Sequence, residues 1–138
     1  MELYHASKQI VQYPEVRKAK YTKDFSWGFY CTNNIQQAIR WANRGAGDSV
    51  INYYEYEPND SLKILKFPEI SDEWLDFIAQ CRSGKTHNYD IVEGPMADDT
   101  VWNYVNDFLT GRISRKQFWI NLFHSSDIQR WLRGLKYC

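Results

Sequence analysis

The chain has little cysteine and no regular spacing of metal ligands. Its three cysteines, Cys31, Cys81 and Cys138, are widely separated among 138 residues. An odd number of scattered cysteines argues against a disulfide framework, and neither they nor the three histidines have the spacing of zinc ligands. We therefore expect reduced thiols, no bound metal and a cytoplasmic protein.

The chain also lacks an excess of charge of either sign and any long apolar run. Its 17 Lys and Arg residues balance 17 Asp and Glu residues. A neutral chain has no overall field that draws it to phosphate polymers or anionic lipid, so non-specific nucleic-acid binding is disfavoured. No stretch approaches the ~20 apolar residues that span a bilayer, and no cationic start precedes an apolar run. We predict no membrane association and no signal peptide.

Aromatic residues, in contrast, are abundant. Six Trp, ten Tyr and seven Phe make up 17% of the chain. The length suits one domain that spans residues 1–138. Because rings bury the most apolar area per residue, most of them should lie in its core, and a surplus suits a pocket that stacks a flat ligand.

The hydrophobic pattern predicts an α+β fold. In residues 24–32, Phe25, Trp27, Phe29 and Cys31 alternate with Ser26, Gly28, Tyr30 and Thr32, which predicts a strand with an apolar core face and a polar face suited to a pocket. Other strands are expected at residues 2–5, 49–57, 62–67, 89–92 and 120–124. Helices are expected after Asn33 or Asn34, from Ser71 or Asp72 through Cys81, from Asp98 or Asp99, from Ser114, and from Ser126 or Asp127. This order of elements is typical of α+β proteins rather than of repeating βαβ units.

Apolar residues at helical spacing indicate which helix faces are buried. The first helix has the stripe Ile35, Ala38, Ile39 and Ala42, with Gly45 as its stop. In the second, Trp74, Leu75 and Ile78 should point inward. The third has the stripe Val101, Tyr104, Val105, Phe108 and Leu109, and Gly111 ends it.

Several residues could bind a ligand. His5, at the end of the first strand, can donate and accept hydrogen bonds at once, and Ser7 follows it. Gly28 would let a ligand approach the backbone closely. Tyr30 should face away from the core, and Trp41, eleven residues later, is off the stripe of its helix, so two rings could sandwich a flat group. Taken singly, each feature also fits an ordinary structural residue.

Together these residues resemble a known pattern. Leu-Tyr-His-x-Ser, Gly-Phe-Tyr-x-Thr and an aromatic residue eleven positions later resemble ADP-ribosyltransferases of the His–Tyr–Glu/Asp/Gln class. More closely, the chain resembles a small bacterial family of domains of unknown function. Its pattern includes Asp-Phe-x-x-Gly-Phe-Tyr-x-Thr, Glu-Trp-Leu-Asp-Phe and Tyr-Asp-Ile-Val-x-Gly-Pro-x-Ala-Asp-Asp, here residues 24–32, 73–77 and 89–99. The resemblance covers about residues 1–114 and leaves a divergent tail, 115–138.

The resemblance implies a split β-sheet core flanked by helices, and NAD⁺ as substrate. His5 would hold the adenosine ribose with Ser7 nearby, Gly28 would admit the nicotinamide amide, and Tyr30 and Trp41 would flank the nicotinamide ring. The implied NAD⁺-binding residues are His5, Ser7, Gly28, Tyr30, Thr32 and Trp41. Members of such families are often toxins of toxin–antitoxin pairs, which implies a small antitoxin protein as partner.

The implied reaction is transfer of ADP-ribose from NAD⁺, in which a carboxylate or amide stabilises an oxocarbenium-like transition state. Relatives carry a Gln shortly before a Phe-His-Thr segment, but the matching place here is near Ile120, ahead of Asn121-Leu-Phe-His-Ser125. Besides Tyr30, the catalytic candidates are Gln117, close in sequence, and Asp98 and Asp99, which serve equally well as helix caps.

Three hypotheses follow from the sequence. The first is an NAD-dependent mono-ADP-ribosyltransferase that acts as the toxin of a bacterial toxin–antitoxin module. The second is a catalytically silenced relative that binds only NAD⁺ or a protein partner, which the change near Ile120 favours. The third is an RNA-cleaving toxin that uses His5, His124 and a tyrosine, against which the neutral charge counts. The sequence does not specify the acceptor.

Overall fold

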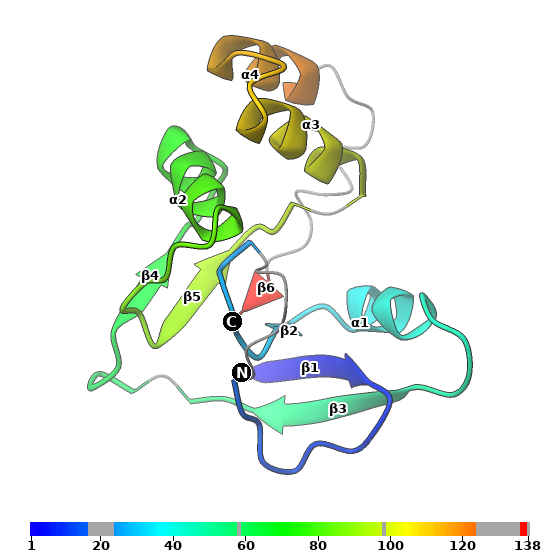
Figure 1. Ribbon diagram of the computed structural model, residues 1–138. Coiled ribbons are helices and arrows are strands. Elements are labelled where there is room, and N and C mark those ends of the chain that lie inside the picture. The colour runs from blue at the N-terminus through cyan, green and yellow to red at the C-terminus, as the bar shows by residue number, and fades with distance from the viewer. Residues whose placement is uncertain (17–23, 58, 98, 124–135, 138) are drawn as a thin grey trace.

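The computed structural model describes residues 1–16, 24–57, 59–97, 99–123 and 136–137 (Figure 1). In chain order, the described elements are β1 (Glu2–Ser7), β2 (Cys31–Thr32), α1 (Ile35–Ala42), β3 (Val50–Glu55), β4 (Ile64–Lys66), α2 (Asp72–Arg82), β5 (Ile91–Gly94), α3 (Asp99–Leu109), α4 (Arg115–Phe123) and β6 (Lys136–Tyr137). The prediction of a small α+β fold is confirmed. None of the helices described is long and apolar enough to cross a membrane.

The strands form one sheet with two distinct halves. The strand order is β3-β1-β2-β6-β5-β4. β3, β1 and β2 are antiparallel, whereas β4 and β5 are parallel. The halves meet through the two-residue β6, which pairs with both β2 and β5 (Figure 1). Because so short a strand contributes few backbone hydrogen bonds, side chains must supply much of the connection between the halves.

The pairing of β1 with β3 defines one open face of the first half. Leu3 pairs with Tyr54 and His5 with Asn52. Residues two apart on a strand, and residues directly opposite on a neighbour, point to the same side of a sheet. Leu3, His5, Asn52 and Tyr54 therefore share one face, which we call the His5 face.

Helix α1 covers the other face of this half. Thr32 pairs with Tyr4, whose side chain points away from the His5 face, and the Thr32 hydroxyl donates to the Gln37 side-chain oxygen on α1 at 2.6 Å. α1 packs against β1, β2 and β3. The His5 face is therefore covered by loops and not by a helix.

Helix α1 starts where the sequence predicts, but its buried side differs. The Asn34 side chain accepts hydrogen bonds from the N–H groups of Gln36 and Gln37, which caps the helix. Gln37 and Ala38 are buried, whereas Ile35 and Ile39 of the predicted stripe are 45% and 36% exposed. The stripe prediction is therefore wrong at these two positions, because the contact of Gln37 with Thr32 turns the side of the helix that carries Gln37 and Ala38 toward the sheet. The helix ends at Ala42 with Asn43 as cap, so Gly45 is not its stop.

Helices α2 and α3 bury the side chains that the sequence predicts. Ser71 caps α2, and Trp74, Leu75 and Ile78 are fully buried. Val101 and Val105 of α3 are buried, and the rest of the predicted stripe packs against the same core. This core lies between α2, α3, α4 and β5, and includes Phe25, Phe67, Trp74, Leu75, Ile78, Val92, Val101, Val105, Phe118 and Leu122.

The tail departs from the prediction. A strand was expected at 120–124, but α4 runs through Phe123, so that prediction is wrong for residues 120–123. Phe118 and Leu122, one helical turn apart, are both fully buried, and this packing selects the helix. His124 and the helix expected from Ser126 or Asp127 lie outside the described residues, and β6 was not predicted.

Candidate functional site

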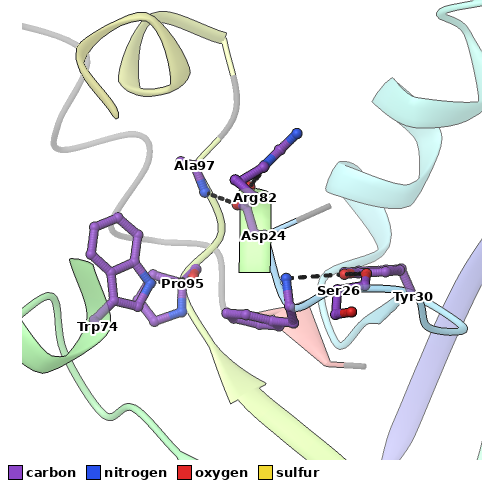
Figure 2. Close-up of polar contacts among 8 residues, drawn as sticks. Asp24, Ser26, Tyr30, Trp74, Arg82, Pro95 and Ala97 are labelled. Carbon is purple, nitrogen blue, oxygen red and sulfur yellow. Dashed lines mark hydrogen bonds and ion pairs between the residues drawn. The ribbon is translucent and has the colours of Figure 1, made fainter. Parts of the chain in front are cut away.

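Residues 24–30, which we call the Asp24 loop, form a closed turn rather than the predicted strand. The Tyr30 hydroxyl accepts a hydrogen bond from the Phe25 N–H at 3.1 Å and donates one to the Ser26 carbonyl at 2.6 Å (Figure 2). Ser26 has a φ of 73°, which takes the backbone out of the extended region. Of the predicted strand, only Cys31 and Thr32 lie in a described strand, β2, and Ser26 forms an isolated β-bridge.

Asp24 anchors this loop to the second half of the molecule. Its side chain is fully buried and forms an ion pair with Arg82 at the end of α2. The Arg82 Nε donates to it at 2.7 Å, and the Ala97 N–H after β5 donates to its other oxygen (Figure 2). The Arg82 guanidinium in turn lies over the Trp102 ring of α3, 4.0 Å from its centroid. One carboxylate thus connects the loop, α2 and the segment that leads into α3.

His87 makes a second connection to the loop. Its Nε2 lies 2.9 Å from the Phe25 carbonyl oxygen, and the Tyr89 N–H donates to its Nδ1 at 3.2 Å. Because a carbonyl only accepts and an N–H only donates, this geometry fits the neutral imidazole with its hydrogen on Nε2. The ring packs against Phe77 and Tyr89, with centroids 5.4 and 5.8 Å apart.

His5 is held in place by the far end of the same loop. Its Nδ1 lies 2.6 Å from the Tyr30 carbonyl oxygen, so Nδ1 is the donor. Its ring stacks on Phe29, with centroids 4.0 Å apart and an interplanar angle of 28°. Phe29 also meets Tyr54 edge-on at 5.9 Å. The Phe29 ring therefore lies over the His5 face.

Two cavities lie on either side of Phe29. The first, of about 400 Å³, we call the His5 cavity; the second, of about 450 Å³, we call the aromatic cavity. The His5 cavity is lined by His5, Ser7, Gly28 and Phe29, together with residues 9–13 and Glu15. The lining of the aromatic cavity includes the rings of Trp27, Phe29, Tyr56, His87 and Tyr89, as well as Asp90. Gly28 and Phe29 line both, so this short segment is the wall between them.

The segment of residues 9–16 contributes to both cavities, because residues 9–13 and Glu15 line the His5 cavity and Val16 lines the aromatic cavity. The Asn52 side chain accepts from the Val11 N–H at 2.9 Å and donates to the His5 and Gln9 carbonyls. The Tyr54 hydroxyl donates to the Val11 carbonyl at 2.5 Å. These bonds tie the segment across the His5 face.

With this geometry in view, the comparisons with known proteins give one match. A family model described as "Protein of unknown function (DUF3990)" matches residues 1–132. The chain belongs to this family. The matched range includes both cavities, the Asp24 loop and all four described helices. No curated protein and no solved structure matches the chain.

Within this DUF3990 chain, the structure brings three of the predicted site residues together. His5, Ser7 and Gly28 all line the His5 cavity. They come from β1 and from the Asp24 loop, which are separate in sequence. Their predicted contacts with NAD⁺ stay predictions.

The other predicted binding residues lie elsewhere. The prediction that Tyr30 faces away from the core is wrong, because the residue is only 7% exposed, belongs to the core, and its hydroxyl bonds to the loop backbone. Thr32 is fully buried and bonded to Gln37 on the α1 side. Trp41 is half-buried on α1. None of these three is among the described residues that line either cavity.

The catalytic candidates of the tail are also distant from the His5 face. Gln117 is exposed on α4, and its side-chain amide donates to the Asn121 oxygen at 2.7 Å. Ile120 is exposed on the same helix. Figure 1 shows α3 and α4 at the opposite end of the molecule from β1 and β3. Asp98 lies outside the described residues, and Asp99 begins α3, although its side chain lies outside them too.

Sequence reasoning missed the residues that connect the walls of the cavities. Asp24 was visible as a lone carboxylate at the start of an apolar stretch, and a buried acid of this kind needs a cationic partner. His87 carried no comparable signal, because it stands in a polar loop. The alternation of residues 24–32 predicts an unbroken strand and therefore puts Phe29 in the core, whereas its ring lines both cavities.

Proposed function

We propose that this chain binds NAD⁺ on the His5 face and transfers its ADP-ribose to an acceptor. The observation that carries the proposal is that His5, Ser7 and Gly28, chosen from the sequence by their resemblance to ADP-ribosyltransferases, line a single cavity. The division of the sheet into two halves supports the proposal, because the resemblance to ADP-ribosyltransferases implies a split β-sheet core.

The chemistry of the two cavities fits the two ends of NAD⁺. An imidazole, a hydroxyl and backbone groups line the His5 cavity, and these are groups that hydrogen-bond ribose hydroxyls. Rings line the aromatic cavity, which suits a flat nicotinamide. In this placement Trp27 and Phe29 contact the nicotinamide ring in place of Tyr30 and Trp41, and Gly28 lies between the two ends of the ligand.

The reaction would break the bond between the nicotinamide nitrogen and C1′ of the ribose. Nicotinamide leaves with the electron pair of that bond, and an acceptor oxygen or nitrogen attacks C1′ and loses its proton. Positive charge develops on the ribose in the transition state and is stabilised by a nearby negative group. Among the described residues, the carboxylate that lines the aromatic cavity is Asp90, and it can supply this charge in place of the Gln of relatives.

The resemblance also supports a biological role as the toxin of a two-gene module in the bacterial cytoplasm, with a small antitoxin protein as partner. Expression of the chain alone should then arrest growth, and a Ser7→Ala variant should arrest it less. Equal growth of cells that express the wild type and of cells that express none would contradict this role.

One observation favours the second candidate, a silenced relative that binds NAD⁺ without turnover. The position that matches the expected Gln lies near Ile120, on an exposed part of α4 instead of a strand beside the cavity. Binding of NAD⁺ without release of nicotinamide would support this candidate, and modification of any macromolecule would refute it.

A calorimetric titration with NAD⁺ tests the binding site. Ser7→Ala removes one hydrogen-bonding group and should weaken binding about fivefold, which corresponds to roughly 1 kcal/mol. His5→Ala should weaken it more, because it also removes the stack with Phe29. Tyr4→Phe is the matched control, since Tyr4 lies on the same strand with its side chain on the opposite face. Equal affinity for NAD⁺ in the wild type and all three variants would contradict the proposed binding site.

A further inference from the structure

The aromatic cavity has two walls that come from different halves of the molecule. One wall is the Asp24 loop with Trp27 and Phe29, and the other is the segment from Thr86 to Val92. A flat ring can bind between two such walls only if the gap between them is fixed, because ring stacking depends on a narrow range of separations.

Several described side chains hold the Asp24 loop in place, among them His5, which bonds to the Tyr30 carbonyl at the far end of the loop. Tyr30 closes the loop on itself, and Asp24 fastens its start to Arg82 and Ala97. Both of these side chains are buried in the interior. His87 is different, because it lines the aromatic cavity and also bonds to the loop at the Phe25 carbonyl. It therefore connects one wall of the cavity directly to the other.

We propose that His87 is a positioning residue for the nucleotide site, fixing the separation of the two walls between which a flat ring binds. Its Nε2–H holds the Phe25 carbonyl on the loop, while its Nδ1 accepts from the Tyr89 N–H and holds the ring that forms the opposite wall. The role requires a side chain that donates at one end and accepts at the other. A phenyl ring retains the packing against Phe77 and Tyr89 but does neither.

The proposal rests on the proposed NAD⁺ site, so its test has one measurement with ligand and one without. The variants are His87→Phe, which retains a ring, and His87→Gln, whose amide both donates and accepts. Without ligand, hydrogen–deuterium exchange is followed in peptides that cover residues 25–31. Exchange there should rise at least fivefold in His87→Phe and stay within twofold of wild type in His87→Gln.

With ligand, NAD⁺ affinity should fall at least fivefold in His87→Phe and be rescued to within twofold by His87→Gln. A residue that serves only overall stability would not separate these variants once both are shown to be folded. Should His87→Phe fail to fold, His87→Glu takes its place, because an ionised carboxylate cannot donate to the Phe25 carbonyl.

Unchanged exchange in the 25–31 peptides of His87→Phe would overturn the proposal, and so would wild-type affinity in that variant. If the wild type itself binds no NAD⁺, the proposed function fails by that result alone. The exchange measurement then still decides whether His87 orders the loop.

Discussion

The Tyr30 hydroxyl closes the Asp24 loop, because it accepts from the Phe25 N–H and donates to the Ser26 carbonyl. The alternation of residues 24–32 predicts an exposed tyrosine on a strand, whereas its ring is buried and its hydroxyl bonds to two backbone groups of its own loop. The difference arises at Ser26, whose φ of 73° breaks the strand. Few residues other than glycine adopt that region, so the alternation contained no signal of the turn.

The Tyr30 hydroxyl should therefore matter for folding. Tyr30→Phe leaves the Phe25 N–H and the Ser26 carbonyl without their partner in a buried place, which should lower the free energy of unfolding by about 1–3 kcal/mol. Urea denaturation measures this change. An unaltered unfolding free energy, with weaker NAD⁺ binding, would instead favour the ligand contact that the sequence predicts.

Helices show what sequence patterns predict at the scale of an element. The stripes of α2 and α3 were predicted correctly because many residues contribute to each pattern. The helix in the tail was not predicted through residue 123, because a short segment can fit both periods. Ile120 and Leu122 have the spacing of a strand, whereas Phe118 and Leu122 have the spacing of a helix. The packing of this segment against α2 and α3 selects the helix. The two-residue β6 is too short to leave any pattern.

The attachment of α4 to α2 should weaken in acid. A hydrogen bond from the Trp119 indole N–H at 2.9 Å, followed by the contacts of Arg115, holds the pKa of Asp72 below its ordinary value. A carboxyl with a lowered folded pKa contributes stability above its unfolded pKa, and this is lost as the pH falls through the folded value. The contact should therefore loosen below about pH 4.

An NMR titration of the Asp72 carboxyl carbon tests this expectation. Trp119→Phe removes the donor and should raise the pKa of Asp72 toward its ordinary value. Lys116→Ala, an exposed change on the same helix, should leave it in place. The same Asp72 pKa in wild type and Trp119→Phe would show that the indole bond does not act on this carboxyl.

At the scale of the whole molecule, the central feature is how the two halves of the sheet are joined. Composition predicted one domain with a surplus of Trp, Tyr and Phe rings, and the structure places four of those rings around the aromatic cavity. The connection between the halves was not predictable, because it depends on Asp24 meeting Arg82 across 58 positions of the chain. No local pattern encodes such a pairing.

Asp24→Asn should therefore destabilise the molecule as a whole. It removes the charge of a fully buried carboxylate from its ion pair with Arg82, whose side chain is only 24% exposed, and loss of one partner of a buried pair costs about 3 kcal/mol. The control is Asp107→Asn, whose pair with Arg112 at 3.8 Å is well exposed and worth less than about 1 kcal/mol. Similar denaturation midpoints for the two variants would show that Asp24 does not join the halves.

The most direct test of the account is transfer of label from NAD⁺ marked in its adenylate phosphate. The purified protein is incubated with a bacterial lysate, alongside Ser7→Ala and the control Tyr4→Phe. We predict label on a macromolecule with wild type and Tyr4→Phe, and markedly less with Ser7→Ala, because the ligand binds on the His5 face. Equal labelling by all three proteins would contradict the placement of the site, and the absence of both label and bound NAD⁺ would contradict the proposed function itself.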